Sequence, residues 1–342
     1  MTATVARAEG RPSRQQRMVA LAPGLALAGA IAAVATAIGR LAPVLGAPVA
    51  GLVMGVALSG RLHGRAALTP GVRFAGTTLL QVAVVLLGSA LSLRQVARVG
   101  ATSVPVMLGT LTVCLSLAFL IGRRLGIGRD LRTLIGVGTG ICGASAIAAI
   151  SPVIRARNPD VAYAISTIFL FNIAAVIAFP PLGHLLGLDQ HAFGLFAGTA
   201  VNDTSSVVAA ATTYGTDAAN YAIVVKLTRS LMIIPICLAL AAITNRGSKI
   251  GSWWSRAARL VPWFLIGFVL VAAINSAGLI PSVAHAPLRT ASTFLITVAL
   301  TALGLGTDVS GMRRAGLRPL LLGLVLWIAV ASTSLGLQWA AG

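Results

Sequence analysis

Three charged residues lie inside strongly apolar stretches of this chain. Lys226 and Arg229 are three positions apart in "AIVVKLTRSLMIIP" (222–235), so they share one face of a helix. Asp203 lies in "GTAVNDTSSV" (198–207) and is one of only seven acidic residues. In a lipid environment each such charge costs about 2.5–3.5 kcal/mol on insertion scales, so pairing or use is expected. The cationic pair would attract an anion, and Asp203 could exchange a proton. The alternative is an Asp203–Arg229 ion pair that only ties two helices together.

A second feature is the run "GTGICGASAI" (138–147). Its glycines, Gly138-x-Gly140-x-x-Gly143, match the dinucleotide-binding fingerprint, but that fingerprint must follow a strand and open a helix. Here the run lies within one of many consecutive apolar segments, so we reject the nucleotide interpretation. Glycine costs roughly 1 kcal/mol relative to alanine inside a helix. The glycines, together with polar neighbours, therefore indicate an interrupted helix.

The related run 198–207 contains five consecutive polar residues, which cover every face of a helix. Irregular backbone at membrane depth is tolerated only where protein or a water-filled cavity satisfies it. Transporters use such interruptions to offer half-helix N-termini to anions. The alternative is close helix packing through small residues. The candidate substrate-binding set is Thr139, Gly140, Cys142, Gly143, Ser145, Asn202, Asp203, Thr204, Ser205, Ser206, Lys226 and Arg229.

The elements that must position these residues are predicted to be membrane helices. Of the 342 residues, 57% are hydrophobic and only 10% are charged, with a mean hydropathy of +0.93, whereas soluble domains carry about 25% charged residues. Apolar runs long enough to cross a bilayer recur throughout. The sequence predicts an all-α polytopic membrane protein with 10–11 transmembrane helices, inverted repeats and two broken helices. The eleven predicted spans are 18–39, 42–60, 74–93, 101–122, 133–154, 161–182, 191–212, 218–243, 260–278, 288–307 and 317–340.

The first span is too long for the apolar part of a signal peptide, usually about 7–15 residues, so we expect it to be retained. We expect a basic cytoplasmic tail over 1–17 and one transmembrane domain over 18–342. The net charge of +19 comes from arginines clustered between apolar runs, which is typical of topology signals and argues against nucleic acid. Their distribution places the N-terminus in the cytoplasm and the C-terminus outside. On this count the outer loops hold Arg40, Arg94, Arg98, Arg155, Arg157 and Arg289.

Two internal similarities indicate repeats. Residues 87–100 resemble 303–316 at an offset of 216, and eleven crossings would make these two segments face opposite ways, as in an inverted repeat. Gly138-Thr139 and the residues that follow resemble Gly198-Thr199 at an offset of sixty. The same count makes this second pair point the same way, which conflicts with an inverted repeat.

Other chemistry is not indicated. The four histidines lie near span ends without metal-ligand spacing, and Cys114, Cys142 and Cys237 are too scattered for a zinc site or a disulfide framework. Neither a catalytic triad nor a carboxylate pair is visible, so we expect no enzyme activity, no metal and no cofactor. The lone amides Gln81 and Asn172 are more typical of contacts between helices.

The chain resembles the YeiH family of bacterial membrane proteins, described as sulfate exporters. The segments "GTGICGASAIAAISPVI", "GTAVNDTSSVVAAA", "VVKLTRSLMIIP" and "TALGLGTDVSGMRRAGLRPLL" carry the resemblance, which covers nearly the whole chain. It implies an inner-membrane secondary transporter with an inverted-repeat fold like that of the bile-acid-symporter superfamily. Ser151 stands where family members often have an acid, and Asn202 where they often have histidine. These departures leave Asp203 as the only deep carboxylate.

The residues and the resemblance together predict a multi-pass protein of the bacterial cytoplasmic membrane that exports a small inorganic or organic anion, with sulfate as the first candidate. The alternatives are an anion channel and a membrane scaffold or sensor without transport. A proton or sodium as the coupling ion, and a homodimer as the assembly, are left open.

Overall fold

The computed structural model describes residues 14–41, 47–62, 65–233, 235–236, 239–240, 263–306 and 317–341. All regular secondary structure in these ranges is helical, which confirms the predicted all-α fold. Among the described residues, six helices are long and apolar enough to cross a membrane. The elements are α1 (Arg14–Leu41), α2 (Ala47–Leu62), α3 (Thr69–Phe74), the π-helix η1 (Ala75–Leu79), α4 (Leu80–Leu87), the 3₁₀ turn η2 (Gly88–Ala90), α5 (Leu93–Arg124), α6 (Arg129–Gly140), α7 (Ala144–Ile154), α8 (Asn158–Leu185), α9 (Gln190–Ala200), α10 (Thr204–Tyr214), α11 (Thr216–Ser230), α14 (Trp263–Ser276), α15 (Ser282–Leu305) and α17 (Leu317–Ala341).

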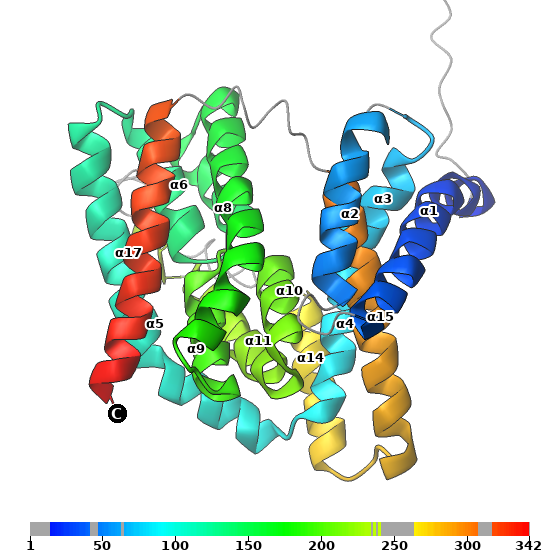
Figure 1. Cartoon of the computed structure of the whole chain (residues 1–342). Coiled ribbons are helices and arrows are strands. Elements are labelled where there is room, and N and C mark those ends of the chain that lie inside the picture. Colours follow the sequence, from blue (N-terminus) through cyan, green and yellow to red (C-terminus); the bar gives the residue numbers. More distant parts are fainter. Residues whose placement is uncertain are drawn as a thin grey trace, which may run out of the picture.

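The helices form two bodies that lie side by side (Figure 1). We call α1, α2, the continuous α3–η2 helix, α14 and α15 the scaffold body. The hairpin body consists of α5 to α11 and α17. Small residues allow close packing within the scaffold. A Cβ added at Gly304 of α15, for example, would lie 2.4 Å from the carbonyl oxygen of Leu52 in α2.

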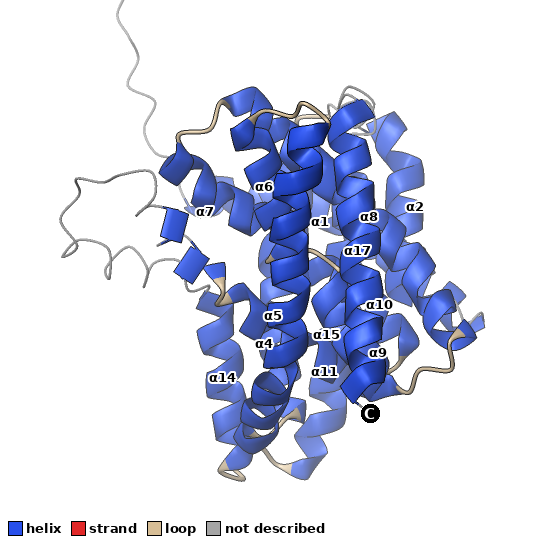
Figure 2. Cartoon of the chain, turned by 90° about the vertical axis from the view of Figure 1, so that its left-hand side faces the viewer, coloured by secondary structure: helices blue, strands red, loops and turns tan. Residues whose placement is uncertain are grey.

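The segment α6–α7 does not cross the membrane but turns back on itself. Gly138 lies before the turn, yet a Cβ added there would lie 3.0 Å from the Cδ1 atom of Ile147 in α7. The pKa of Arg157, which follows α7, is raised chiefly by a hydrogen bond to Asp160, but Asp130 at the start of α6 also contributes. Both ends of the segment therefore lie on one face, and Figure 2 shows α6 and α7 at the same height. We call this segment hairpin 1.

The segment α9–α10 also turns back, from the opposite face. The ring of Tyr214, at the end of α10, stacks on His184 and on Phe193 at the start of α9, with centroids 4.3 and 3.8 Å apart. The Tyr214 hydroxyl donates a hydrogen bond to the carbonyl oxygen of Leu188. Between the two hairpins runs α8, whose 28 residues span roughly 42 Å. Because α8 crosses the whole body, this second segment, hairpin 2, enters from the other side (Figure 1).

This arrangement corrects the predicted path of two of the eleven spans, 133–154 and 191–212. The interruptions lie at the predicted places, but each is the tip of a re-entrant hairpin instead of a break in a crossing helix. The two similar motifs at an offset of sixty therefore enter from opposite faces, which removes the conflict with an inverted repeat. Arg155 and Arg157 move to the face that carries the start of α6, which sharpens the predicted charge asymmetry.

The other repeat is described only in part. The C-terminal ends of α4 and α15, where the two similar segments begin, lie toward opposite faces (Figure 1), as the offset of 216 requires, but residues 307–316 are outside the described ranges. The predicted tail 1–17 is likewise outside them, apart from residues 14–17, which begin α1.

The hairpin topology, taken together with the predicted cytoplasmic N-terminus, predicts which single cysteines an impermeant thiol reagent reaches. Arg129→Cys and Asn158→Cys flank hairpin 1, so both should stay unlabelled in intact cells and react only after permeabilisation. Leu186→Cys and Asp217→Cys flank hairpin 2 and should react in intact cells. All four positions are exposed. Labelling of Asn158→Cys but not Arg129→Cys in intact cells would show instead that α6–α7 crosses.

Candidate functional site

The tip of hairpin 1 consists of Ile141, Cys142 and Gly143. Gly143 has φ 65° and ψ −131°, a conformation that only glycine adopts without strain. The N-cap of the following helix, α7, is Gly143 itself, which has no side chain to accept hydrogen bonds from the first N–H groups. The N-terminus of α7 therefore retains the partial positive charge of the helix dipole.

The tip of hairpin 2 consists of Val201, Asn202 and Asp203, and it is capped differently. The Asp203 carboxylate is the N-cap of α10 and accepts from the backbone N–H of Ser206 at 2.8 Å. The hydroxyls of Ser205 and Ser206 also donate to it. One carboxylate thus binds most of the polar groups of this turn. Local capping therefore explains the run of consecutive polar residues as well as ligand binding does.

Asn172 of α8 contacts both the carboxylate and the backbone of that tip. Its Nδ2 donates to Asp203 at 2.6 Å, and its Oδ1 accepts from the backbone N–H of Asn202 at 3.2 Å. Asn172 is only 2% exposed. From the sequence we expected this amide to make a contact between helices. The structure shows that the contact orients the Asp203 carboxylate.

The two tips touch each other, and two buried cations bind them together. A Cβ added at Gly143 would lie 3.2 Å from Cβ of Asp203. The Lys226 ammonium donates to the carbonyl oxygens of Ile141 and Val201, each at 2.9 Å, and to that of Asn202. Lys226 is completely buried. All three of its donors are used, two on hairpin 2 and one on hairpin 1.

Arg229, one turn further along α11, continues this binding. Its Nε donates to the carbonyl oxygen of Gly140 at 2.8 Å and one Nη to that of Thr139 at 2.8 Å, with a longer contact of 3.4 Å to Val201. The side chain is 1% exposed. We call Lys226 and Arg229 with these carbonyls the carbonyl clamp. Within the described residues Asp203 and Arg229 form no ion pair, so the alternative of an ion pair between these two residues is wrong. Arg229 joins helices through backbone carbonyl oxygens instead.

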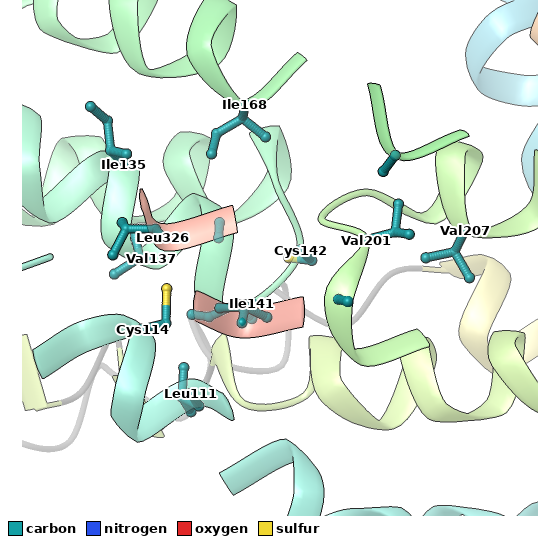
Figure 3. Packing of buried hydrophobic residues seen from close by; sticks show 14 of the residues in the cluster. Leu111, Cys114, Ile135, Val137, Ile141, Cys142, Ile168, Val201, Val207 and Leu326 are labelled. Carbon is teal, nitrogen blue, oxygen red and sulfur yellow. The ribbon is translucent and has the colours of Figure 1, made fainter. Parts of the chain in front are cut away.

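The electrostatics of helix ends explain why two cations lie at this place. The last carbonyls of a helix have no intrahelical partner and carry the negative end of its dipole. Both α6 and α9 end in the protein interior, where water cannot satisfy them. The cations neutralise these two ends. Figure 3 shows how apolar the surroundings are: Ile141, Cys142 and Val201 of the tips lie in one cluster with Leu111 and Cys114 of α5.

On the other side of the tips a cavity of about 260 Å³ separates the two bodies. The hairpin body contributes Ala144 and Ser145 of α7, Thr204 and Ser205 of α10, and both Asn172 and Asp203. The scaffold body contributes Thr77 of η1, Gln81 of α4 and Phe264 of α14, among others. We call it the interbody cavity. The first residues of α7 and α10 face it, so it receives the positive ends of two half-helices.

The predicted site residues thus divide into two groups. Cys142, Ser145, Asp203, Thr204 and Ser205 line the interbody cavity. The others support it from behind: Thr139, Gly140 and Asn202 through their carbonyls, Gly143 through its turn, Ser206 through Asp203, and Lys226 and Arg229 through the clamp. The cationic pair therefore lies behind the tips instead of lining the cavity.

Two polar groups of the scaffold body complete the cavity. Thr77 was not among the predicted residues, and Gln81 was expected only as a contact between helices. Gln81 does make such a contact, because its Oε1 accepts from Trp263 Nε1 at 2.8 Å. A signal was present in the sequence, since both are polar residues in an apolar span, but only the packing of the two bodies places them opposite the hairpin tips. Within the described part of the chain no group of histidine, cysteine or acidic residues has the arrangement of a metal site.

Fold and site together define an α-helical multi-pass membrane protein in which two re-entrant hairpins meet from opposite faces. The family model described as conserved hypothetical protein 698 matches residues 23–323. The chain is 39% identical over 327 residues to UPF0324 membrane protein SAG1125 of Streptococcus agalactiae serotype V, covering 92% of this chain and 96% of the relative. It is 42% identical over 313 residues to UPF0324 membrane protein spr0034 of Streptococcus pneumoniae, covering 89% and 93%. It is 38% identical over 336 residues to UPF0324 membrane protein FN0533 of Fusobacterium nucleatum, covering 92% and 96%.

The chain belongs to this family of UPF0324 membrane proteins. It is the YeiH family that the motifs indicate, so the resemblance is confirmed.

The turn at Gly143 gives a test of the tip geometry. Gly143→Ala would force a side chain into a strained conformation, which costs about 1–3 kcal/mol, and would press it against Asp203. We expect a lower melting temperature of the purified protein. Gly336→Ala in α17 is the control, because an added Cβ there has nothing within 4 Å and alanine favours the helix. Equal melting temperatures for both variants would contradict the assigned geometry of the tip.

Proposed function

We propose that this chain is a secondary transporter that exports a small anion, sulfate or a related sulfur oxyanion, across the bacterial inner membrane with its N-terminus in the cytoplasm. The observation that carries the proposal is the interbody cavity at the joined tips of two opposed hairpins. Interrupted helices from two inverted units meeting at a polar cavity are typical of secondary transporters. Movement of one body against the other would expose such a cavity to each face in turn.

The preference for an anion rests on the helix ends that face the cavity. The N-cap of α7 is a glycine without a capping side chain, and the helix begins at Ala144 and Ser145, both of which line the cavity. Helix N-termini bind anions through free N–H groups and the dipole. Ser145 and Thr204 add hydroxyl donors, whereas the Ser205 hydroxyl already donates to Asp203.

The charged residues behind the tips also favour a negatively charged ligand. At the joined tips the two cations of the clamp outnumber the one carboxylate, Asp203, so the charges at this place sum to a net positive value. The clamp acts on the cavity through its field and through the helix ends that it holds, since its donors are bonded to carbonyls. Asp203 is the group on the cavity wall that could exchange a coupling proton.

The size of the cavity favours a small ligand. Its volume of about 260 Å³ lies below the range of roughly 300–1,000 Å³ of typical pockets for drug-sized molecules. An inorganic oxyanion or a small sulfonate fits this size class. Large organic anions do not.

A cavity-filling substitution tests the transport proposal. Ala144→Trp places an indole in the interbody cavity, so sulfate counterflow in proteoliposomes should fall at least tenfold. Ala148→Trp is the matched control, because it lies one turn along α7, is exposed and does not line the cavity; its flux should stay near that of the unmodified chain. Full counterflow in the Ala144→Trp variant would contradict this location of the site.

The same assay separates the alternatives. A channel would show flux that rises without saturation and no counterflow. A scaffold or sensor would show no flux, either in the unmodified chain or in the Ala144→Trp variant. Saturable counterflow supports the transporter.

Ligand binding gives an independent prediction. Sulfate, sulfite and thiosulfate should raise the melting temperature of the purified protein, because a ligand at 100 times its Kd stabilises the folded state by about 2.7 kcal/mol. Ala144→Trp should abolish the shift and Ala148→Trp should retain it. Equal shifts with chloride at matched ionic strength would show a salt effect without a specific oxyanion site.

A further inference from the structure

The carbonyl clamp has the composition of a cation site that is already filled. Five residues at the ends of the half-helices α6 and α9 direct carbonyl oxygens to the two cations: Thr139, Gly140, Ile141, Val201 and Asn202. In transporters with interrupted helices, half-helix C-termini and unwound carbonyls are the groups that coordinate a coupling cation. Rings of backbone carbonyls likewise replace the hydration shell of an ion in channels.

The position of the Lys226 ammonium makes this comparison specific. Three carbonyls from two chain segments surround one nitrogen, with N···O distances of 2.9 Å to Ile141 and Val201. No water-exposed atom of Lys226 remains, since the residue is 0% exposed. The ammonium is therefore held as a dehydrated ion would be, but a four-carbon stem ties it to α11.

We infer that Lys226 is a tethered replacement for a dissociable cation at the joined hairpin tips. The three carbonyls form a site for a monovalent cation of the ammonium class, and the lysine occupies it permanently. A free cation such as sodium is then not needed to join the tips, so anion transport does not depend on sodium at this place. The statement about transport rests on the proposed function; the cation site itself does not.

The site can be emptied by substitution. Lys226→Ala removes the ammonium and the last three carbons of the stem, which takes the lysine donor from three buried carbonyls and leaves Val201 only its longer contact with Arg229. It also leaves a space of matching length. Unpaired buried polar groups are costly, so the melting temperature of the purified variant should fall. n-Propylammonium replaces the removed atoms one for one and should restore at least half of the loss in a saturable manner. Ammonium, potassium or sodium should restore a smaller part.

Two controls isolate the charge and the space. 1-Propanol has a similar chain without the charge and should restore nothing. Lys226→Met fills the space with an uncharged side chain, so it should be destabilised but insensitive to n-propylammonium. A folded Lys226→Ala variant that none of the four cations stabilises would overturn the inference.

The unmodified chain gives a second measurement that stands if Lys226→Ala does not fold. Its melting temperature should be equal in sodium, potassium and choline chloride at one ionic strength. If sulfate counterflow is observed, its rate should also be equal in these salts. A saturable stabilisation by sodium alone would overturn the inference. Absent counterflow with equal melting temperatures would contradict the proposed function and leave the filled cation site supported.

Discussion

The backbone groups freed by two interrupted helices are the constraint on which this structure depends. Inside a membrane protein every N–H and C=O needs a partner, because no water is available. The chain meets this requirement with Lys226 and Arg229, which lie one turn apart on α11 and donate to the carbonyl ends of both α6 and α9. A single helix thereby joins two hairpins that enter from opposite faces.

The clamp also keeps the negative and the positive helix ends of the two hairpins on different sides of the tips. The C-termini of α6 and α9 face the buried cations, whereas the first residues of α7 and α10 face the interbody cavity. The two N-termini are not equivalent, because the N-cap of α10 is the carboxylate-bearing Asp203 and the N-cap of α7 is Gly143. The resulting cavity wall has an open helix end beside a hydrogen-bonded carboxylate.

The cavity lies between bodies that differ in construction. In the scaffold, glycines let α2 and α15 approach closely; the hairpin body has its own apolar core and, in addition, the polar contacts around Asn172, Asp203 and the clamp. A cavity whose walls come from both bodies changes whenever one moves against the other.

Composition and local pattern alone determined the helical class, the membrane location, both interruptions and the residues around them, because apolar runs, glycines and polar runs are local properties. They also placed Lys226 and Arg229 on one helix face. Whether a chain turns back or continues after an interruption depends on contacts between distant residues, such as Tyr214 with His184 and Phe193. The target of a buried cation depends on which oxygens the fold brings within reach. Only the tertiary structure therefore decided that the cations bind carbonyls, that Asn172 holds Asp203, and that Thr77 and Gln81 close the cavity from the other body.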